Sequence, residues 1–326
     1  LTSITIPNSV TSIKAWAFAG CTSLISIAIP NSVTSIGQGA FDICSSLTTI
    51  VIPDSVTDIG EGLFFCCSSL TSITLPNSMK TIGEMAFYDC SSLTAITIPD
   101  SVTSIGDRAF EDCSSLTTIT IPNSVKVIGD NAFIGCSSLT AITIPDSVTI
   151  IGDGAFYRCS SLTSITIPDN VTSIGKGTFA GCELLTSVVV AEGNSMYDSR
   201  QNCHAIIKTD TDTLVCGCQS TTIPNGVKSI DKWAFMECKM LTSIIIPDSV
   251  TAIGNHAFEK CTSLTTITIP NSVTSIGYEA FYGCSLLTAI AIPNSVITVK
   301  KSAFYGCESL TSIIIGNRVT SIEDYA

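Results

Sequence analysis

The chain repeats one 23-residue unit from end to end, with a single interruption. All twelve prolines, from Pro7 to Pro293, fall at the seventh position of a copy. A fixed period in the twenties predicts a repeat solenoid, because each copy can bury its apolar face only against its neighbours. We expect a single solenoid over residues 1–326, with about 14 repeats, the last incomplete, and an irregular insertion at about 191–217.

The first half of each copy predicts a short β-strand followed by a turn. Ile4 and Ile6 alternate with hydroxyl-bearing residues, so we expect them to point inward while Ser3 and Thr5 point outward. Pro7 has no N–H group and ends the strand. The Asn-Ser pair that follows the proline favours a turn.

The second half of the copy predicts a return to the core. Val10 and Ile13 are apolar, which indicates a second short extended segment. Glycine at the fourteenth position, as in Gly37, is expected to supply a backbone conformation closed to other residues. Ala, Phe and Cys in residues 17–21 are expected on one face of a short helical turn. The predicted fold therefore has short parallel β-strands on one face, with turns, short extended segments and short helical turns elsewhere.

Composition excludes several classes of partner. The net charge is −12 and only 13% of residues are charged, which argues against nucleic acid and against anionic lipid. No run approaches the roughly 18 apolar residues of a membrane span, so no membrane insertion is expected within this chain. No signal-peptide pattern is visible in this segment. The chain begins without Met in mid-stack and stops at Ala326 inside an unfinished copy, so we expect further sequence beyond both ends.

The spacing Leu-x-x-Ile-x-Ile-Pro-Asn-Ser-Val-x-x-Ile-Gly-x-x-Ala-Phe-x-x-Cys resembles the BspA-type leucine-rich repeat family of bacterial and protist surface proteins. The resemblance covers nearly the whole chain. It implies a curved right-handed solenoid that binds other macromolecules, often as an adhesin, and the family pattern contains no catalytic residues. We therefore expect a non-catalytic protein-binding solenoid, located at the cell surface or secreted, that acts in adhesion or host interaction.

The expected partner is a protein or glycoprotein of the host matrix, of a host cell or of a bacterial surface. The alternative is a structural spacer that projects another domain from a surface. Under that alternative, the outward-facing residues of the strands would have no ligand, and substitutions such as Thr120→Lys or Thr143→Lys would leave biological activity unchanged.

Catalytic, cofactor-binding and metal residues are not predicted. The chain has two histidines, and neither has a marked acid–base partner in the sequence. His256 shares a variable position with Arg108 and Asn131, so we expect it to be exposed. Cys203-His204 and Cys216-x-Cys218 lack the spacing of a known zinc site.

Two surfaces are candidates for ligand contact. The first is the outward row on the strands, where apolar residues interrupt a series of threonines. The second is the variable position after the Phe, where large aromatic residues suit protein recognition but could instead be half-buried packing. The strand-face candidates are Thr5, Thr74, Thr97, Thr120, Thr143, Thr166 and Thr268, and the variable-face candidates are Tyr88, Tyr157, Tyr282 and Tyr305.

Twelve of the sixteen cysteines share one position of the copy, which predicts a buried column of reduced, structural thiols. The insertion predicts a β-hairpin, with strands at 205–208 and 213–216 around a polar turn. If the hairpin is centred on Thr209-Asp210, Cys203 lies opposite Cys216; if it is centred one residue later, Cys203 lies opposite Cys218. A disulfide is conceivable in either register. The hairpin either covers the flank of the solenoid or contacts a partner.

Overall fold

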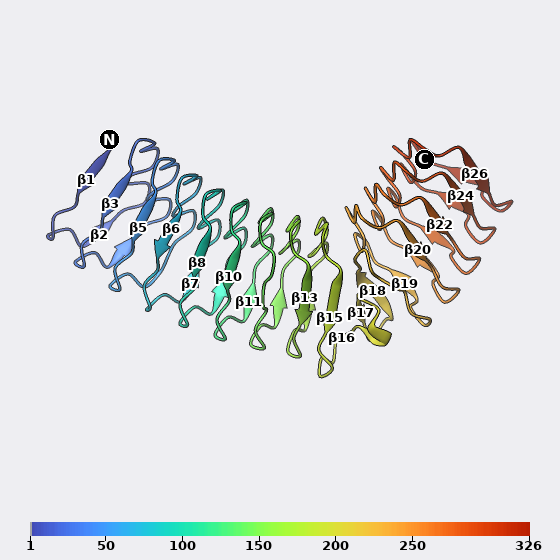
Figure 1. Cartoon of the computed structure of the whole chain (residues 1–326), viewed down its shortest axis with the longest axis horizontal. Coiled ribbons are helices and arrows are strands. Elements are labelled where there is room, and N and C mark those ends of the chain that lie inside the picture. Colours follow the sequence, from blue (N-terminus) through green and yellow to red (C-terminus); the bar gives the residue numbers. More distant parts are fainter. Residues whose placement is uncertain (1) are drawn as a thin grey trace. The chain divides into compact units, whose positions relative to one another are not determined.

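A computed structural model describes residues 2–326 as a stack of short strands and turns (Figure 1). The chain divides into two compact units. Residues 1–162 and 173–178 form unit 1, and residues 163–172 and 179–326 form unit 2. Within each unit, successive copies lie side by side as rungs, which confirms the predicted solenoid architecture.

One column of strands comes from positions 3–6 of the copies. In unit 1 these strands are β1 (Ser3–Thr5), β3 (Ser26–Ala28), β5 (Thr49–Val51), β6 (Ser72–Thr74), β8 (Ala95–Thr97) and β10 (Thr118–Thr120). In unit 2 they are β13 (Ser164–Ile167), β15 (Ser187–Val190), β20 (Ser243–Ile245), β22 (Thr266–Thr268), β24 (Ala289–Ile292) and β26 (Ser312–Ile315).

A second column comes from positions 12 and 13, which confirms the predicted second extended segment. In unit 1 its strands are β2 (Ser12–Ile13), β4 (Ser35–Ile36), β7 (Thr81–Ile82), β9 (Ser104–Ile105), β11 (Val127–Ile128), β12 (Ile150–Ile151) and β14 (Ser173–Ile174). In unit 2 they are β19 (Ser229–Ile230), β21 (Ala252–Ile253), β23 (Ser275–Ile276), β25 (Thr298–Val299) and β27 (Ser321–Ile322).

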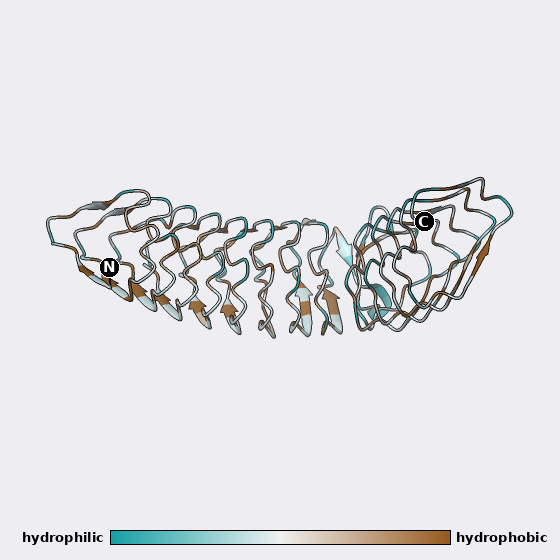
Figure 2. Cartoon of the chain, turned by 90° about the horizontal axis from the view of Figure 1, so that it is seen from above, coloured by the Kyte–Doolittle hydropathy of each residue, from teal (hydrophilic) through white to brown (hydrophobic). Residues whose placement is uncertain are grey.

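The repeat period sets the strand register. Ile96 pairs with Ile119 in parallel, and Thr97 pairs with Thr120, each 23 residues further along the chain. The side chains alternate as predicted, because Ile119 is 7% exposed while its neighbours Thr118 and Thr120 face solvent. The same alternation is visible as brown and pale bands along the strands in Figure 2.

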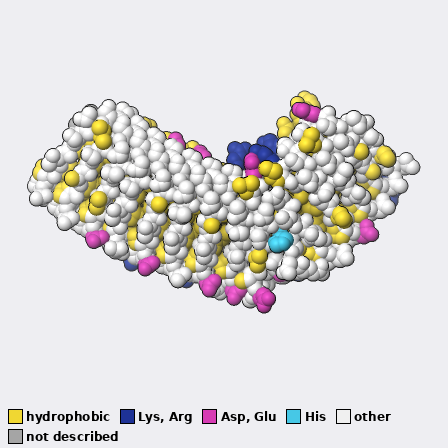
Figure 3. Space-filling view, in the orientation of Figure 1, with side chains coloured by type: hydrophobic (Ala, Val, Ile, Leu, Met, Phe, Trp, Pro, Cys, Tyr) yellow, Lys and Arg dark blue, Asp and Glu magenta, His cyan; other side chains and the backbone are white. Residues whose placement is uncertain are grey.

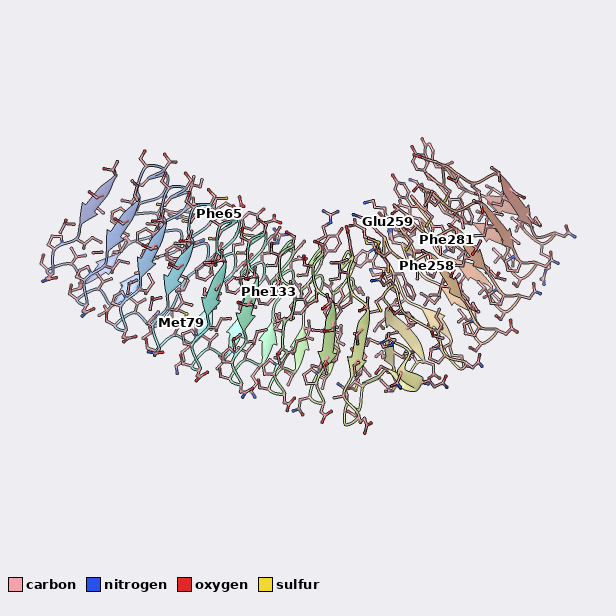
Figure 4. All side chains as sticks on the ribbon, viewed as in Figure 1. Phe65, Met79, Phe133, Phe258, Glu259 and Phe281 are labelled. Atoms are coloured by element: carbon pink, nitrogen blue, oxygen red, sulfur yellow. The ribbon has the colours of Figure 1, made fainter. Side chains whose placement is uncertain are left out.

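The core is a set of identical side chains stacked from rung to rung. Phe258 and Phe281 are fully buried, with parallel rings whose centroids lie 5.3 Å apart (Figure 4). In unit 1, Phe41 and Phe64 stack in the same way at 5.6 Å. Such offset stacking adds to the hydrophobic stabilisation that burial of each ring already supplies.

The predicted short helical turns are wrong. Residues 14–21 form consecutive tight turns in which backbone N–H groups alternate between partners within the rung and in the next rung. Phe18 N–H donates to the carbonyl of Ala40 in the following copy, at 2.8 Å, whereas Cys21 N–H donates back to Phe18. The sole helix among residues 2–326 is the 3-10 helix η1 (Arg200–Asn202). Inter-rung hydrogen bonding therefore takes the donors that a helix would use internally.

Glycine at position 14 has a different role from the one predicted. Gly106 does not adopt a left-handed backbone conformation. A Cβ atom on Gly106 would instead lie 2.8 Å from the backbone of Gly83 and Glu84 in the preceding rung. In the regular copies the left-handed residues lie mainly at positions 16 and 20, such as Trp16, with a φ of 62°, and Gly20, with a φ of 70°. Close approach between rungs, not backbone freedom, therefore selects glycine at position 14.

The insertion forms part of the second column of unit 2. It contains β16 (Tyr197–Asp198), β17 (Ile206–Lys208) and β18 (Thr213–Cys216), in which β17 and β18 make the predicted antiparallel hairpin. β18 then pairs in parallel with β19, so the hairpin extends the sheet. Arg200 donates to both carboxylate oxygens of Asp198, at 2.8 Å from Nε and 2.7 Å from Nη2, and Nη1 donates to Asp212 at 2.8 Å.

Candidate functional site

The threonines of the strand face are exposed in both units. They are Thr5, Thr74, Thr97, Thr120 and Thr143 in unit 1, and Thr166 and Thr268 in unit 2. Among residues 2–326, none of these seven hydroxyl groups has a hydrogen-bond partner in the protein. Hydroxyls at other positions do: Ser32 Oγ donates to the carbonyl of Val10 at 2.7 Å, and Thr103 Oγ1 donates to that of Lys80 at 3.2 Å. The fold therefore uses the hydroxyl groups at positions 9 and 11 of the copy and leaves those of the strand-face threonines available.

Apolar residues interrupt the same row on unit 2. Ile245 on β20 is 83% exposed, Ile314 on β26 is 65% exposed, and Val189 on β15 is 41% exposed. Ile245, Thr268 and Ala291 occupy successive rungs of the sheet β20–β22–β24–β26. Figure 3 shows this pattern on the surface: hydrophobic side chains, in yellow, lie separately among uncharged polar atoms, in white.

A groove of about 570 Å³ lies beside β20 in unit 2. It is lined by Thr221–Ile223, Asn225 and Ser243–Asp248, and it includes the exposed side chain of Ile245. Asp248 is its only charged lining residue. An apolar side chain with a polar rim is the arrangement that protein-recognition surfaces use.

The tyrosines of the variable face are mostly involved in packing. Tyr88, Tyr157 and Tyr282 are half-buried, and Tyr88 stacks on Phe65 with a centroid distance of 4.5 Å. Tyr305 is 49% exposed and stacks on Tyr282 at 5.3 Å. Three of the four tyrosines are therefore half-buried packing residues, and Tyr305 is the exposed one.

His256 is not exposed, contrary to the sequence-based expectation. Its side chain retains 16% exposure and lies between two glutamates from neighbouring positions of the stack. His256 Nδ1 lies 2.7 Å from Glu259 Oε2 and 3.3 Å from Glu279 Oε2. Sequence reasoning missed this cluster. The signal was the repeat itself, because His256 and Glu279 are 23 residues apart and so occupy the same position in adjacent rungs.

The cysteine column is buried except for the half-buried Cys21 and Cys307, and nine of its twelve thiols make the same hydrogen bond. Cys67 Sγ donates to the carbonyl of Phe41 at 3.1 Å, and the same bond recurs at successive rungs of both units. Its donors are Cys44, Cys67, Cys90, Cys113, Cys136, Cys159, Cys261, Cys284 and Cys307. Burial raises the pKa of these thiols, for example that of Cys44 to about 11.

All sixteen cysteines are free thiols in this structure, including Cys203, Cys216 and Cys218 in and beside the insertion. Ile207 pairs with Leu214, which is the later of the two registers considered for the hairpin. Cys218 Sγ donates to the carbonyl of His204 at 3.3 Å, and Cys203 Sγ contacts that of Ala205 at 3.8 Å. The two thiols thus have separate backbone partners instead of a shared disulfide.

Stacked short parallel strands joined by turns define this chain as a leucine-rich repeat solenoid. The family model described as "BspA type Leucine rich repeat region (6 copies)" matches residues 1–117, 80–206 and 214–326. The chain belongs to the BspA-type leucine-rich repeat family. This family and fold are typically non-catalytic, and the fold is commonly used for protein binding.

Solved structures of bacterial leucine-rich repeat proteins are similar to this chain. A leucine rich cell surface protein from Faecalibacterium prausnitzii A2-165 is 34% identical, with a TM-score of 0.71, over 97% of this chain and 88% of that one. A leucine-rich repeat protein from Bacteroides ovatus is 30% identical, with a TM-score of 0.67, over 98% and 82%. A comparison with curated proteins finds no significant match.

In residues 2–326 there is no helix of the length and apolarity that crossing a bilayer requires.

Proposed function

We propose that this chain is a non-catalytic protein-binding solenoid of the cell surface or of secreted material, and that its ligand contacts the strand face. The supporting observation is the row of outward side chains that the fold does not use. Among residues 2–326, the hydroxyl groups of Thr120 and Thr143 have no protein partner, and Ile245, on the edge strand β20, is 83% exposed. Donors, acceptors and apolar anchors on a rigid surface are the elements of a protein-recognition site.

The proposed partner is a protein or glycoprotein of the host matrix, of a host cell or of a bacterial surface. The net charge of −12 disfavours polyanionic partners such as nucleic acid. The similarity to a bacterial cell surface protein over 97% of this chain supports the surface location.

Binding to immobilised matrix proteins and to intact host and bacterial cells tests the proposal. We expect Ile245→Lys or Thr268→Lys to weaken retention on the responsive target at least about 10-fold, since each places an unpaired charge in the contact. The matched control is Tyr305→Lys, which adds the same charge on the variable face of unit 2. Loss of binding with Tyr305→Lys alone would move the site to the variable face.

A structural spacer, which is the alternative function, predicts a different result. In that case, Thr120→Lys, Thr143→Lys and Ile245→Lys would all leave cell attachment unchanged, provided that their melting temperatures match that of the parent chain. Absence of binding to every matrix protein and cell type would contradict the proposed function.

A further inference from the structure

One cluster of metal-ligating side chains lies away from the strand face, at the turn edge of unit 2. Figure 4 marks its place with Glu259, beside the buried Phe258. His256 Nδ1 and one carboxylate oxygen each from Glu259 and Glu279 all lie within 4.8 Å of one another. Position 16 of the copy supplies His256 and Glu279 from adjacent rungs, and position 19 supplies Glu259.

The backbone holds these three groups in place. His256 and Glu279 both have left-handed conformations, with φ of 55° and 54°. His256 N–H donates to the carbonyl of Tyr278 in the next rung at 3.0 Å, which ties together the two rungs that supply the cluster. The rings of Tyr278 and His256 pack perpendicular to each other, with centroids 4.7 Å apart. The repeat itself therefore brings the three side chains together before any ion binds.

The geometry leaves one proton to satisfy two carboxylates. Glu259 Oε2 is 2.7 Å and Glu279 Oε2 is 3.3 Å from the same Nδ1 atom, which carries at most one hydrogen. The side chain of Glu259 is only 9% exposed, so water cannot fully solvate its charge. A divalent cation at the point where the three atoms converge would satisfy both carboxylates at once.

We infer that His256, Glu259 and Glu279 form a binding site for a divalent transition-metal ion, with Zn²⁺ as the best fit. An imidazole nitrogen combined with two carboxylates suits zinc, whereas calcium and magnesium take oxygen ligands. Zinc–ligand bonds of about 2.1 Å place tetrahedral ligand atoms about 3.4 Å apart. The Nδ1–Glu279 distance of 3.3 Å matches this spacing, whereas Glu259 Oε2, which is hydrogen-bonded to Nδ1 at 2.7 Å, would move outward by about 0.7 Å when the ion replaces that hydrogen bond. On binding, the imidazole hydrogen resides on Nε2, Nδ1 donates its lone pair, and the fourth position is left for water.

Lys260 supports the site from its outer side. Its Nζ lies 3.5 Å from Glu259 Oε1 and 3.5 Å from Glu237 Oε1. This contact engages the oxygen of Glu259 that faces away from His256 and so orients Oε2 toward the ion. Outer contacts of this kind fix the ligands of metal sites in other proteins.

Isothermal titration of the full chain with Zn²⁺, under reducing conditions, tests the inference. We expect one ion per chain, and at least about 10-fold weaker binding in His256→Asn and in Glu279→Gln. The matched control is Glu111→Gln, because Glu111 holds the same position of its copy as Glu259 but pairs with Arg108 at 3.6 Å. Glu279 is 31% exposed, so its variant is expected to keep the parent's melting temperature.

Absorption spectra with Co²⁺ separate this site from the thiols. We expect visible d–d bands without the near-ultraviolet charge-transfer band that sulfur ligands produce. Failure to bind Zn²⁺ at millimolar concentration, undiminished binding in both variants, or a sulfur charge-transfer band would each overturn the inference.

Discussion

Cys113 Sγ donates a hydrogen bond to the carbonyl oxygen of Phe87, at 3.2 Å, across 26 residues of sequence. Each such bond joins position 21 of one copy to position 18 of the copy before it. The thiol therefore has two functions in the stack, as a small apolar filler and as a donor to a buried carbonyl. This relationship leads to the first prediction.

Replacing Cys113 by Ala is expected to lower the free energy of unfolding by about 1–2 kcal/mol, because it removes the hydrogen bond and leaves a small cavity. Cys66 is the matched control, since it is half-buried and lies outside the column. We expect Cys66→Ala to cost less than about 0.5 kcal/mol. Urea unfolding of the two variants measures the difference, and equal losses would show that the column has no special role.

Alkaline pH is expected to destabilise the fold. Burial raises the pKa of Cys238 to about 12 from an ordinary value of 9.0, so the folded state keeps this thiol neutral where the unfolded chain ionises it. The folded state binds more protons above pH 9, and stability therefore falls as pH rises from 9 toward 12, by up to about 1.4 kcal/mol per pH unit for each such thiol.

Urea unfolding at pH 8, 9 and 10 under reducing conditions checks this pH dependence. We expect Cys238→Ala to have a shallower decline than the parent chain. Parallel declines for the two proteins would contradict the assigned cause.

The two classes of glycine are expected to respond differently to alanine. Gly106→Ala should cost about 3 kcal/mol, because the new Cβ would lie 2.8 Å from backbone atoms of the preceding rung. Gly20→Ala should cost about 1 kcal/mol, because Gly20 has open space around it and only its φ of 70° opposes a side chain. Thermal melting of the two variants measures the ranking, and the reverse order would contradict the close approach at position 14.

Alanine substitutions at adjacent residues of β20 are expected to differ sharply in their effect on the free energy of unfolding. Ile244 is 6% exposed and packs in the core, so Ile244→Ala should lower the unfolding free energy by about 2–5 kcal/mol. Ile245 points outward with 83% exposure, so Ile245→Ala should change it by less than about 0.5 kcal/mol. Denaturant titration checks both. A comparable loss for Ile245→Ala would mean that this side chain serves the fold and is not available to a ligand.

Much of the fold follows from the repeat period. The inward Ile119 and outward Thr120 could be placed from alternation alone, because a strand has a side-chain period of two. The hairpin of the insertion could be placed from two apolar segments around a polar turn. In contrast, Ala, Phe and Cys at a helical spacing wrongly indicated a helical turn, because spacing does not reveal whether an N–H donor bonds within its own rung or to the next.

The candidate sites divide in the same way. The exposure of the strand-face threonines could be predicted, whereas the absence of protein partners for their hydroxyls could not. Thr120 and Thr103 are both threonines of the repeat, but only the Thr103 hydroxyl lies close enough to a carbonyl of the preceding rung to form a hydrogen bond. The environment of His256 was also missed, since it depends on Glu279 one full repeat later.

By itself, the sequence determined that the chain stacks similar rungs. It also determined which residues line the core and where the 23-residue period is interrupted. Those properties depend on period and polarity, which are local. Only the tertiary structure decided which groups meet across rungs: the Cys113 thiol with the Phe87 carbonyl, Gly106 with the backbone before it, and His256 with two carboxylates. Contacts between rungs depend on backbone direction and on distances of a few ångströms, which the order of residues along the chain does not specify.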